Sequence, residues 1–146
     1  MGKSYQKQWV GVFGDPVDDN PTVVMEQAAF DYAEIPMEYL TIQVKREDLK
    51  AAVEGLRAMN FTGINITMPH KGEVLQYLDQ ISESARTMGA VNTVYWKDGK
   101  LTGENTDGKG FLKSLQDGNV SIKGKKAFIL GAGGAHARPA GVGHGP

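Results

Sequence analysis

Residues 63–71 read GINITMPHK, and the pattern of this stretch points to an α/β fold. Ile64 and Ile66 alternate with smaller or polar residues, as in a β-strand, and the strand ends at Thr67 in a polar turn. Pro69 then suits the first turn of a helix, where its missing N–H costs nothing. In α/β proteins the ends of strands present side chains to ligands. The stretch is therefore both a fold signal and a candidate site.

Strands and helices alternate on both sides of this stretch. Toward the N-terminus the pattern predicts strands at 8–13 and 37–44, each followed by a helix, at 22–32 and 46–59. Toward the C-terminus it predicts helices at 69–79 and 82–88, a hairpin of 91–96 with 101–102, a helix headed by Asp107, and a strand at 125–130. Such alternation predicts an α/β fold with a mostly parallel sheet and helices on both faces.

Composition narrows the classes of function. The 146 residues carry 16 basic and 17 acidic side chains and no cysteine. No run reaches the about 18 to 20 apolar residues of a membrane-spanning helix, and the N-terminus lacks a signal-peptide core. We therefore expect a soluble, cytoplasmic protein without disulfides and without a membrane or nucleic-acid partner. Its three histidines are scattered, so we expect no metal site.

The C-terminal residues have a different composition. The strand predicted at 125–130 runs into the glycine-rich turn 131–135, where a dinucleotide-binding unit would begin. Residues 135–146 consist mainly of alanine, glycine, proline, histidine and arginine. This is the composition that a GC-rich reading frame gives when it is translated out of register. The expectation is a substrate domain at 1–120, the start of a truncated Rossmann domain at 121–134, and a non-native tail at 135–146. A flexible natural tail is the alternative.

Three polar clusters are candidates for chemistry: residues 63–71, 90–93 and 103–108. Taken singly, each has a structural interpretation. Asn92 and Asn105 are common turn formers, Asp107 suits a helix start, and Lys71 suits a solvated first turn.

Taken together, the clusters resemble a known family. GINITMPHK at 63–71, GAVNTV at 89–94, GENTDG at 103–108 and GAGGA at 131–135 are similar to the motifs of shikimate dehydrogenases, which include the quinate/shikimate dehydrogenases. The resemblance extends over about 10–135. It implies an NADP-dependent enzyme that reversibly reduces 3-dehydroshikimate to shikimate, with an N-terminal domain for the substrate and a Rossmann domain for the nucleotide.

The resemblance also implies roles for individual residues. Lys71 and Asp107 match the catalytic lysine and aspartate of the family, and an ammonium stabilises and protonates the oxygen of a carbonyl that receives hydride. The positions that match groups binding the substrate hydroxyls are Asn65, Thr67 and Asn92. Those that match the nucleotide-binding turn are Gly131, Gly133, Gly134 and Ala135.

One segment departs from the family pattern. A His-Ser-x-Ser stretch, whose serines hold the substrate carboxylate, is replaced here by Asp19-Asn20-Pro21-Thr22. Asn20 and Thr22 stand at the two serine positions and still offer hydrogen-bond donors. Asp19 would repel a substrate carboxylate within about 6 Å by about 1 to 3 kcal/mol. In the alternative, Asp18 and Asp19 point to solvent and only Asn20 and Thr22 face the cleft. A threonine at the second serine position would also suit the quinate-using branch of the family.

Three interpretations of function remain open. The chain is an enzyme by descent that is inactive in this form, a non-catalytic module that binds shikimate or quinate, or a decaying gene product. Quinate dehydrogenase is the alternative activity.

Overall fold

The computed structural model describes residues 7–126 and 128. The expected nucleotide-binding turn and the tail at 135–146 lie outside the described residues, as does most of the strand predicted at 125–130. The domain boundaries at 120 and 134 therefore stay predictions.

The fold is built on a six-stranded sheet with the order β2-β1-β3-β5-β6-β4. Its strands are β1 (Gln8–Gly14), β2 (Met37–Gln43), β3 (Gly63–Ile66), β4 (Gln80–Ile81), β5 (Thr93–Lys97) and β6 (Lys100–Glu104). β1 pairs in parallel with β2 and β3, and β4 pairs in parallel with β6. β5 is antiparallel to both neighbours, β3 and β6. The prediction of a mostly parallel sheet is confirmed.

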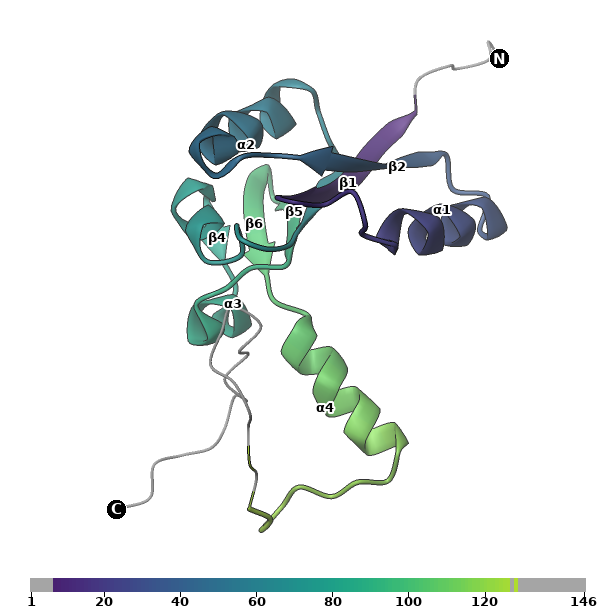
Figure 1. Ribbon diagram of the computed structural model, residues 1–146, viewed down its shortest axis with the longest axis vertical. Helices are drawn as coiled ribbons and strands as arrows, with labels where there is room; N and C mark the ends of the chain where they lie inside the picture. The colour runs from purple at the N-terminus through teal and green to yellow at the C-terminus, as the bar shows by residue number, and fades with distance from the viewer. Residues whose placement is uncertain (1–6, 127, 129–146) are drawn as a thin grey trace.

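The helices are α1 (Thr22–Tyr32), α2 (Leu49–Ala58), α3 (Glu83–Met88) and α4 (Asp107–Asp117), with short 3₁₀ helices at Arg46–Asp48 and Glu73–Tyr77. α1 and α2 lie on opposite sides of β1 and β2 (Figure 1). The alternation along β1 explains this placement, since successive side chains point to opposite faces. Val12 joins a small core with Tyr39 and residues of α1, whereas Phe13 joins the main core with residues of α2.

The main core is continuous beneath α2 and the β3–β5–β6 part of the sheet. Leu49, Val53 and Leu56 line one side of α2 at helical spacing and are at most 1% exposed. They pack against Ile64 and Ile66 of β3 and other apolar residues of the sheet. Burial of such side chains contributes about 1.5 to 3 kcal/mol each, so this face holds the sheet to its helix.

The helix predicted from Pro69 to Asp79 is wrong. Turns occupy 69–72, and only the 3₁₀ helix Glu73–Tyr77 follows. The chain is then drawn to the edge of the sheet, where Asp79 N–H donates to the Leu101 carbonyl and the Asp79 carboxylate accepts from Leu101 N–H at 2.7 Å. These bonds lead into β4, a two-residue strand that the sequence pattern did not reveal.

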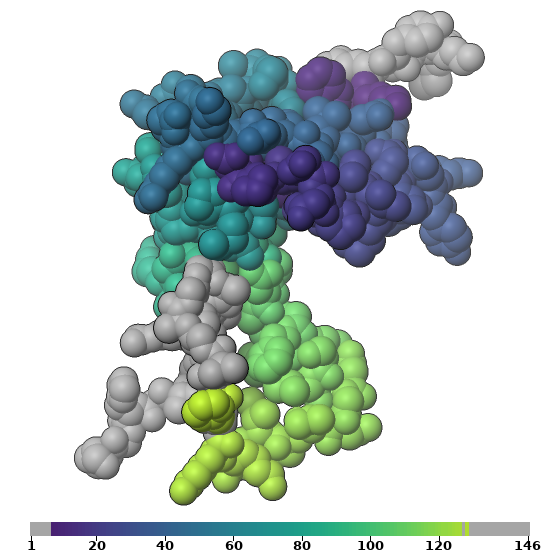
Figure 2. Space-filling view, in the orientation of Figure 1, coloured from purple at the N-terminus to yellow at the C-terminus, as the bar shows by residue number. Residues whose placement is uncertain are grey.

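α4 begins at the edge of the sheet where β6 ends, and its later turns extend away from the sheet (Figures 1 and 2). It has no buried residue, and Phe111 is 60% exposed. Among the described residues, no helix is both long and apolar enough to cross a membrane.

Acid should weaken the edge of the sheet that Asp79 holds. Hydrogen bonds from Arg57 and from the Leu101 N–H hold the pKa of Asp79 below its usual 3.8. A carboxyl whose pKa is lower in the folded state contributes stability above the unfolded pKa and loses it as the pH falls further. We expect Asp79→Asn to lower the free energy of unfolding in urea at pH 7, with a difference that shrinks toward pH 3. Asp117→Asn, on the surface of α4, is the control, and an equal effect of both substitutions would contradict the account.

Candidate functional site

The reversed direction of β5 gathers the three polar clusters at one edge of the sheet. β3 and β6 end at this edge, at Ile66 and Glu104. β5 runs antiparallel to both, so its first residue, Thr93, lies at the same edge. The residues that follow β3, precede β5 and follow β6 therefore meet there. They belong to the three motifs that the sequence singled out.

A carboxylate with two partners forms the centre of the site. Lys71 Nζ lies 2.7 Å from Asp107 Oδ2, and Asn92 Nδ2 donates to the other oxygen, Oδ1, at 2.7 Å. The side chain of Lys71 is 18% exposed and that of Asp107 is 48% exposed. The pair is therefore oriented by the protein and still reachable from solvent. Of the predicted site residues, these three have side chains that are bonded directly to one another.

Asn92 also fixes the start of α4. Its Nδ2 donates to Thr106 Oγ1 at 2.8 Å, and its Oδ1 accepts from Thr106 N–H at 3.0 Å. The amide thus binds the backbone just before Asp107 as well as the Asp107 carboxylate itself. Asn92 is more than a turn former. Asn105 is likewise more than a turn former, since its buried side chain accepts from the Asp107 N–H and donates to the distant Ala90 carbonyl.

Asn65 is held by a tyrosine that sequence reasoning missed. Tyr39 OH donates to Asn65 Oδ1 at 2.8 Å, and the Asn65 amide nitrogen faces the Asn92 carbonyl at 3.4 Å. Tyr39 is 5% exposed, and burial raises the pKa of its phenol far above the ordinary range. The phenol therefore remains protonated and serves as a donor. Tyr39 lies on β2 opposite Val10 of β1 and belongs to the small core. A tyrosine at a buried position of a predicted strand was the one sign in the sequence that its hydroxyl needs a hydrogen-bond partner.

Thr67 lies where the loop after β1 meets the loop after β3. A Cβ atom on Gly14 would stand 2.5 Å from Thr67 Cγ2, so only glycine fits without a shift of the threonine. Asp15 N–H donates to the Met68 carbonyl at 3.0 Å. These contacts bring the segment that begins at Asp15 to the same edge as the Lys71–Asp107 pair.

Asn20 and Thr22 open α1. Asn20 Oδ1 accepts from Thr22 N–H at 3.0 Å, and both residues are half-buried. Neither is hydrogen-bonded to the Lys71–Asp107–Asn92 group. Asp18 and Asp19 are exposed and, within the described chain, form no ion pair. The substrate role predicted for Asn20 and Thr22 stays a prediction.

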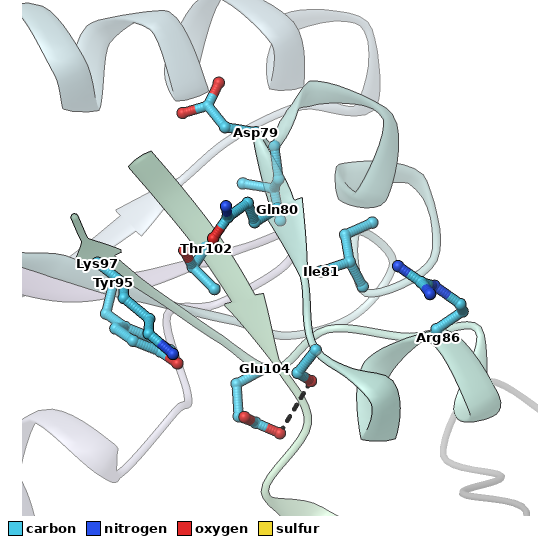
Figure 3. A pocket seen from close by; sticks show the side chains of 10 residues that line it. Asp79, Gln80, Ile81, Arg86, Tyr95, Lys97, Thr102 and Glu104 are labelled. Atoms are coloured by element: carbon cyan, nitrogen blue, oxygen red, sulfur yellow. Dashed lines mark hydrogen bonds between the residues drawn. The ribbon is translucent and has the colours of Figure 1, made fainter. Parts of the chain in front are cut away.

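A separate hollow of about 600 Å³ lies over β4, β5 and β6 (Figure 3). Polar side chains of these strands and of α3 line it, including Tyr95, Lys97, Thr102, Glu104 and Arg86. It contains none of the predicted site residues. In the part of the chain that the structure describes, no three potential ligands stand together to hold a metal ion.

Comparison with known proteins decides the family. Residues 12–94 match the family described as the shikimate dehydrogenase substrate binding domain. The chain belongs to this family. The matched range contains Lys71 and Asn92, whereas Asp107 lies beyond it. The resemblance inferred from the motifs is confirmed.

Individual relatives agree. The chain is 44% identical over 125 residues to a shikimate dehydrogenase (NADP(+)) of Alkaliphilus oremlandii, covering 86% of this chain and 44% of the relative. It is 39% identical to the structure of a shikimate 5-dehydrogenase from Listeria monocytogenes in complex with shikimate and NAD, with a TM-score of 0.85, covering 90% of this chain and 46% of the other.

A second similar structure has a different name. The ligand-free 5-ketofructose reductase of a Gluconobacter strain is 46% identical to this chain, with a TM-score of 0.75, covering 78% of this chain and 41% of the other. The chain spans about half the length of the curated relatives it matches. These matches alone therefore do not assign the activity of the full-length relatives to this chain.

Removal of the Asn92 side chain should loosen the start of α4. We expect Asn92→Ala to accelerate hydrogen exchange of the Thr106 amide about fivefold, because loss of one hydrogen bond costs about 1 kcal/mol. The matched control is Asn20→Ala, which removes the equivalent bond at α1 and should affect the Thr22 amide alone. Unchanged exchange at Thr106 in Asn92→Ala, measured by NMR, would contradict this role.

Proposed function

We propose that this chain is the substrate-binding part of an NADP-dependent dehydrogenase that interconverts 3-dehydroshikimate and shikimate. The observation that supports this most strongly is the Lys71–Asp107 ion pair, with Asn92 donating to the same carboxylate, at the edge where β3 and β6 end. Membership of the shikimate dehydrogenase family supports the same proposal. Shikimate or quinate is the proposed small-molecule partner, and the proposed location is the cytoplasm.

The described residues supply proton transfer and orientation. The nicotinamide nucleotide supplies hydride when it is bound. As hydride reaches the carbonyl carbon, negative charge develops on the oxygen, and the Lys71 ammonium stabilises this charge and donates its proton to the oxygen. Asp107 holds the ammonium in place and accepts a hydrogen bond from a neighbouring substrate hydroxyl. In the reverse direction, neutral Lys71 removes the hydroxyl proton.

The open side of the ion pair suits approach of a hydride donor, since Asp107 is about half exposed. The proposed nucleotide contacts at Gly131, Gly133, Gly134 and Ala135 fall outside the described residues. Their assignment stays a prediction from the GAGGA motif.

Loss of either member of the ion pair should lower turnover. For this test, residues 1–126 are joined in frame to the nucleotide-binding half of the Listeria shikimate 5-dehydrogenase. Lys71→Ala and Asp107→Asn should each lower kcat for shikimate oxidation by about 10²- to 10⁴-fold with little change in KM. Lys113→Ala, on the exposed side of α4, should leave kcat unchanged. Turnover within a few-fold of the parent for Lys71→Ala would contradict the proposed proton transfer.

The loop after β1 favours a second candidate, the reduction of a neutral polyhydroxy ketone. Asp15, Asp18 and Asp19 make this loop acidic, and none forms an ion pair within the described chain. A substrate carboxylate at this position would be repelled, whereas sugar hydroxyls would donate hydrogen bonds to the aspartates. The similarity to a 5-ketofructose reductase supports this candidate.

Calorimetric titration with shikimate and 5-ketofructose separates the two candidates. If Asp19 faces the substrate, Asp19→Asn should tighten shikimate binding about 5- to 30-fold, which is about 1 to 2 kcal/mol, and salt should reduce this gain. It should not tighten the binding of 5-ketofructose. Asp98→Asn, in the turn between β5 and β6, is the control. Tight shikimate binding that Asp19→Asn and salt leave unchanged would contradict the neutral-ketone candidate.

A further inference from the structure

The segment between β6 and α4 carries Asp107, and one carboxylate organises it. Oε1 of Glu104, the last residue of β6, accepts hydrogen bonds from Ser82 Oγ at 3.0 Å and from Ser84 Oγ. The same oxygen accepts from the Asn105 N–H and from Lys109 Nζ, both at 3.2 Å. A single oxygen therefore joins the end of β6, the start of α3 and the first turn of α4.

The position of Glu104 makes this arrangement firm. Its side chain is 16% exposed and lies at the end of β6 beside Ser82, at the rim of the hollow over β4–β6 (Figure 3). Ser82 is itself engaged as the N-cap of α3, where its Oγ accepts from Ala85 N–H at 3.1 Å. The carboxylate thus binds to residues that the fold already holds in place.

Burial opposes the charge of Glu104, but its hydrogen bonds outweigh burial. Burial raises the pKa of this carboxyl, whereas the hydrogen bonds from Ser84, Ser82 and Lys109 lower it. The hydrogen bonds have the larger combined effect, so the pKa lies below its usual 4.5. Glu104 is therefore a carboxylate at neutral pH. Hydrogen bonds to a charged acceptor are about twice as strong as neutral ones.

Hydrogen bonds of Asn105 connect Glu104 to Asp107. The backbone N–H of Asn105 is bound to Glu104, and its side chain is 2% exposed. Asn105 Oδ1 accepts from the Asp107 N–H at 3.1 Å, and its Nδ2 donates to the Ala90 carbonyl at 3.0 Å. Ala90 lies two residues before Asn92. One buried amide thus sets the start of the Asp107 helix against the segment that carries Asn92.

We propose that Glu104 is a positioning residue for the reaction: by holding Asn105, it sets the Asp107 carboxylate against Lys71 and Asn92 without touching the substrate. The proposal rests on the proposed function of the Lys71–Asp107 pair. It assigns to GENTDG a second carboxylate with a role distinct from that of Asp107.

The test compares Glu104→Ala with Glu104→Gln in the 146-residue chain. The side-chain amide signals of Asn92 in NMR spectra report its bonds to Asp107 and Thr106. We expect Glu104→Ala to shift these signals and to weaken shikimate binding at least fivefold. Glu104→Gln keeps an acceptor oxygen for the Asn105 N–H, so it should restore most of both properties.

Asp79→Asn is the matched control, because Asp79 accepts from a backbone N–H at the other end of β6, that of Leu101. This substitution should lower stability without shifting the Asn92 signals. If Glu104→Ala fails to fold, Ser84→Ala is the variant that tests the proposal. It removes one hydrogen-bond donor to Glu104. It should shift the Asn92 signals in the direction expected of Glu104→Ala.

Unchanged Asn92 signals in folded Glu104→Ala, or in Ser84→Ala if Glu104→Ala does not fold, would overturn the proposal. Equal shifts in Asp79→Asn would also overturn it. The spectral comparison needs no ligand. Absence of shikimate binding by the parent chain would therefore count against the proposed function and leave the test of Glu104 intact.

Discussion

The site depends on the reversed direction of β5 within an otherwise parallel sheet. A strand parallel to β3 would begin at the opposite edge, and Asn92, which immediately precedes β5, would lie far from Lys71. The antiparallel pairings of β5 with β3 and β6 place Asn92 between the end of β3 and the start of α4. From there its one amide binds both the Asp107 carboxylate and the Thr106 backbone. The hairpin thus turns three separate motifs into one site.

Close packing at the end of β6 supports this arrangement. A Cβ atom on Gly103 would stand 2.6 Å from Leu78 Cδ1 and 2.8 Å from Val91 Cγ2. Val91 is fully buried, and its N–H donates to the Lys71 carbonyl at 2.8 Å. The segment before Asn92 is therefore fixed from two sides, by the core beneath it and by the backbone of Lys71. A side chain at Gly103 would displace the residues that connect Lys71 to Asn92.

The pattern of apolar and polar residues predicted most of the longer elements. α1 was predicted with its observed bounds, and β1, the β5–β6 hairpin and α3 were predicted to within two residues. β4 has only two residues and no period to detect, and the bonds of Asp79 to Leu101 that create it connect residues far apart in sequence. The same bonds hold Asp79 at the edge of the sheet, so the helix that was predicted to reach Asp79 does not form there. Local patterns contain no information on such contacts.

The candidate site was predictable to a different extent. Family motifs identified Lys71, Asn92 and Asp107, and the structure places these side chains in contact. Tyr39 and Glu104 were missed because their roles arise from partners brought close by the fold: Asn65 for Tyr39, and Ser82, Ser84 and Lys109 for Glu104. The motifs predicted substrate roles for Asn20 and Thr22, and the structure shows only that the Thr22 N–H donates to the Asn20 side chain at the start of α1.

NMR chemical-shift mapping of shikimate and 5-ketofructose on the 146-residue chain tests the central claim, that the edge where β3 and β6 end is the substrate site. The account predicts that the signals of Asn65, Thr67, Asn92 and Thr106 shift with one of these ligands, while those of Tyr95, Lys97 and Thr102 in the hollow over β4–β6 do not. Shifts confined to the hollow, with the signals of Asn92 and Thr106 unchanged at saturation, would contradict it.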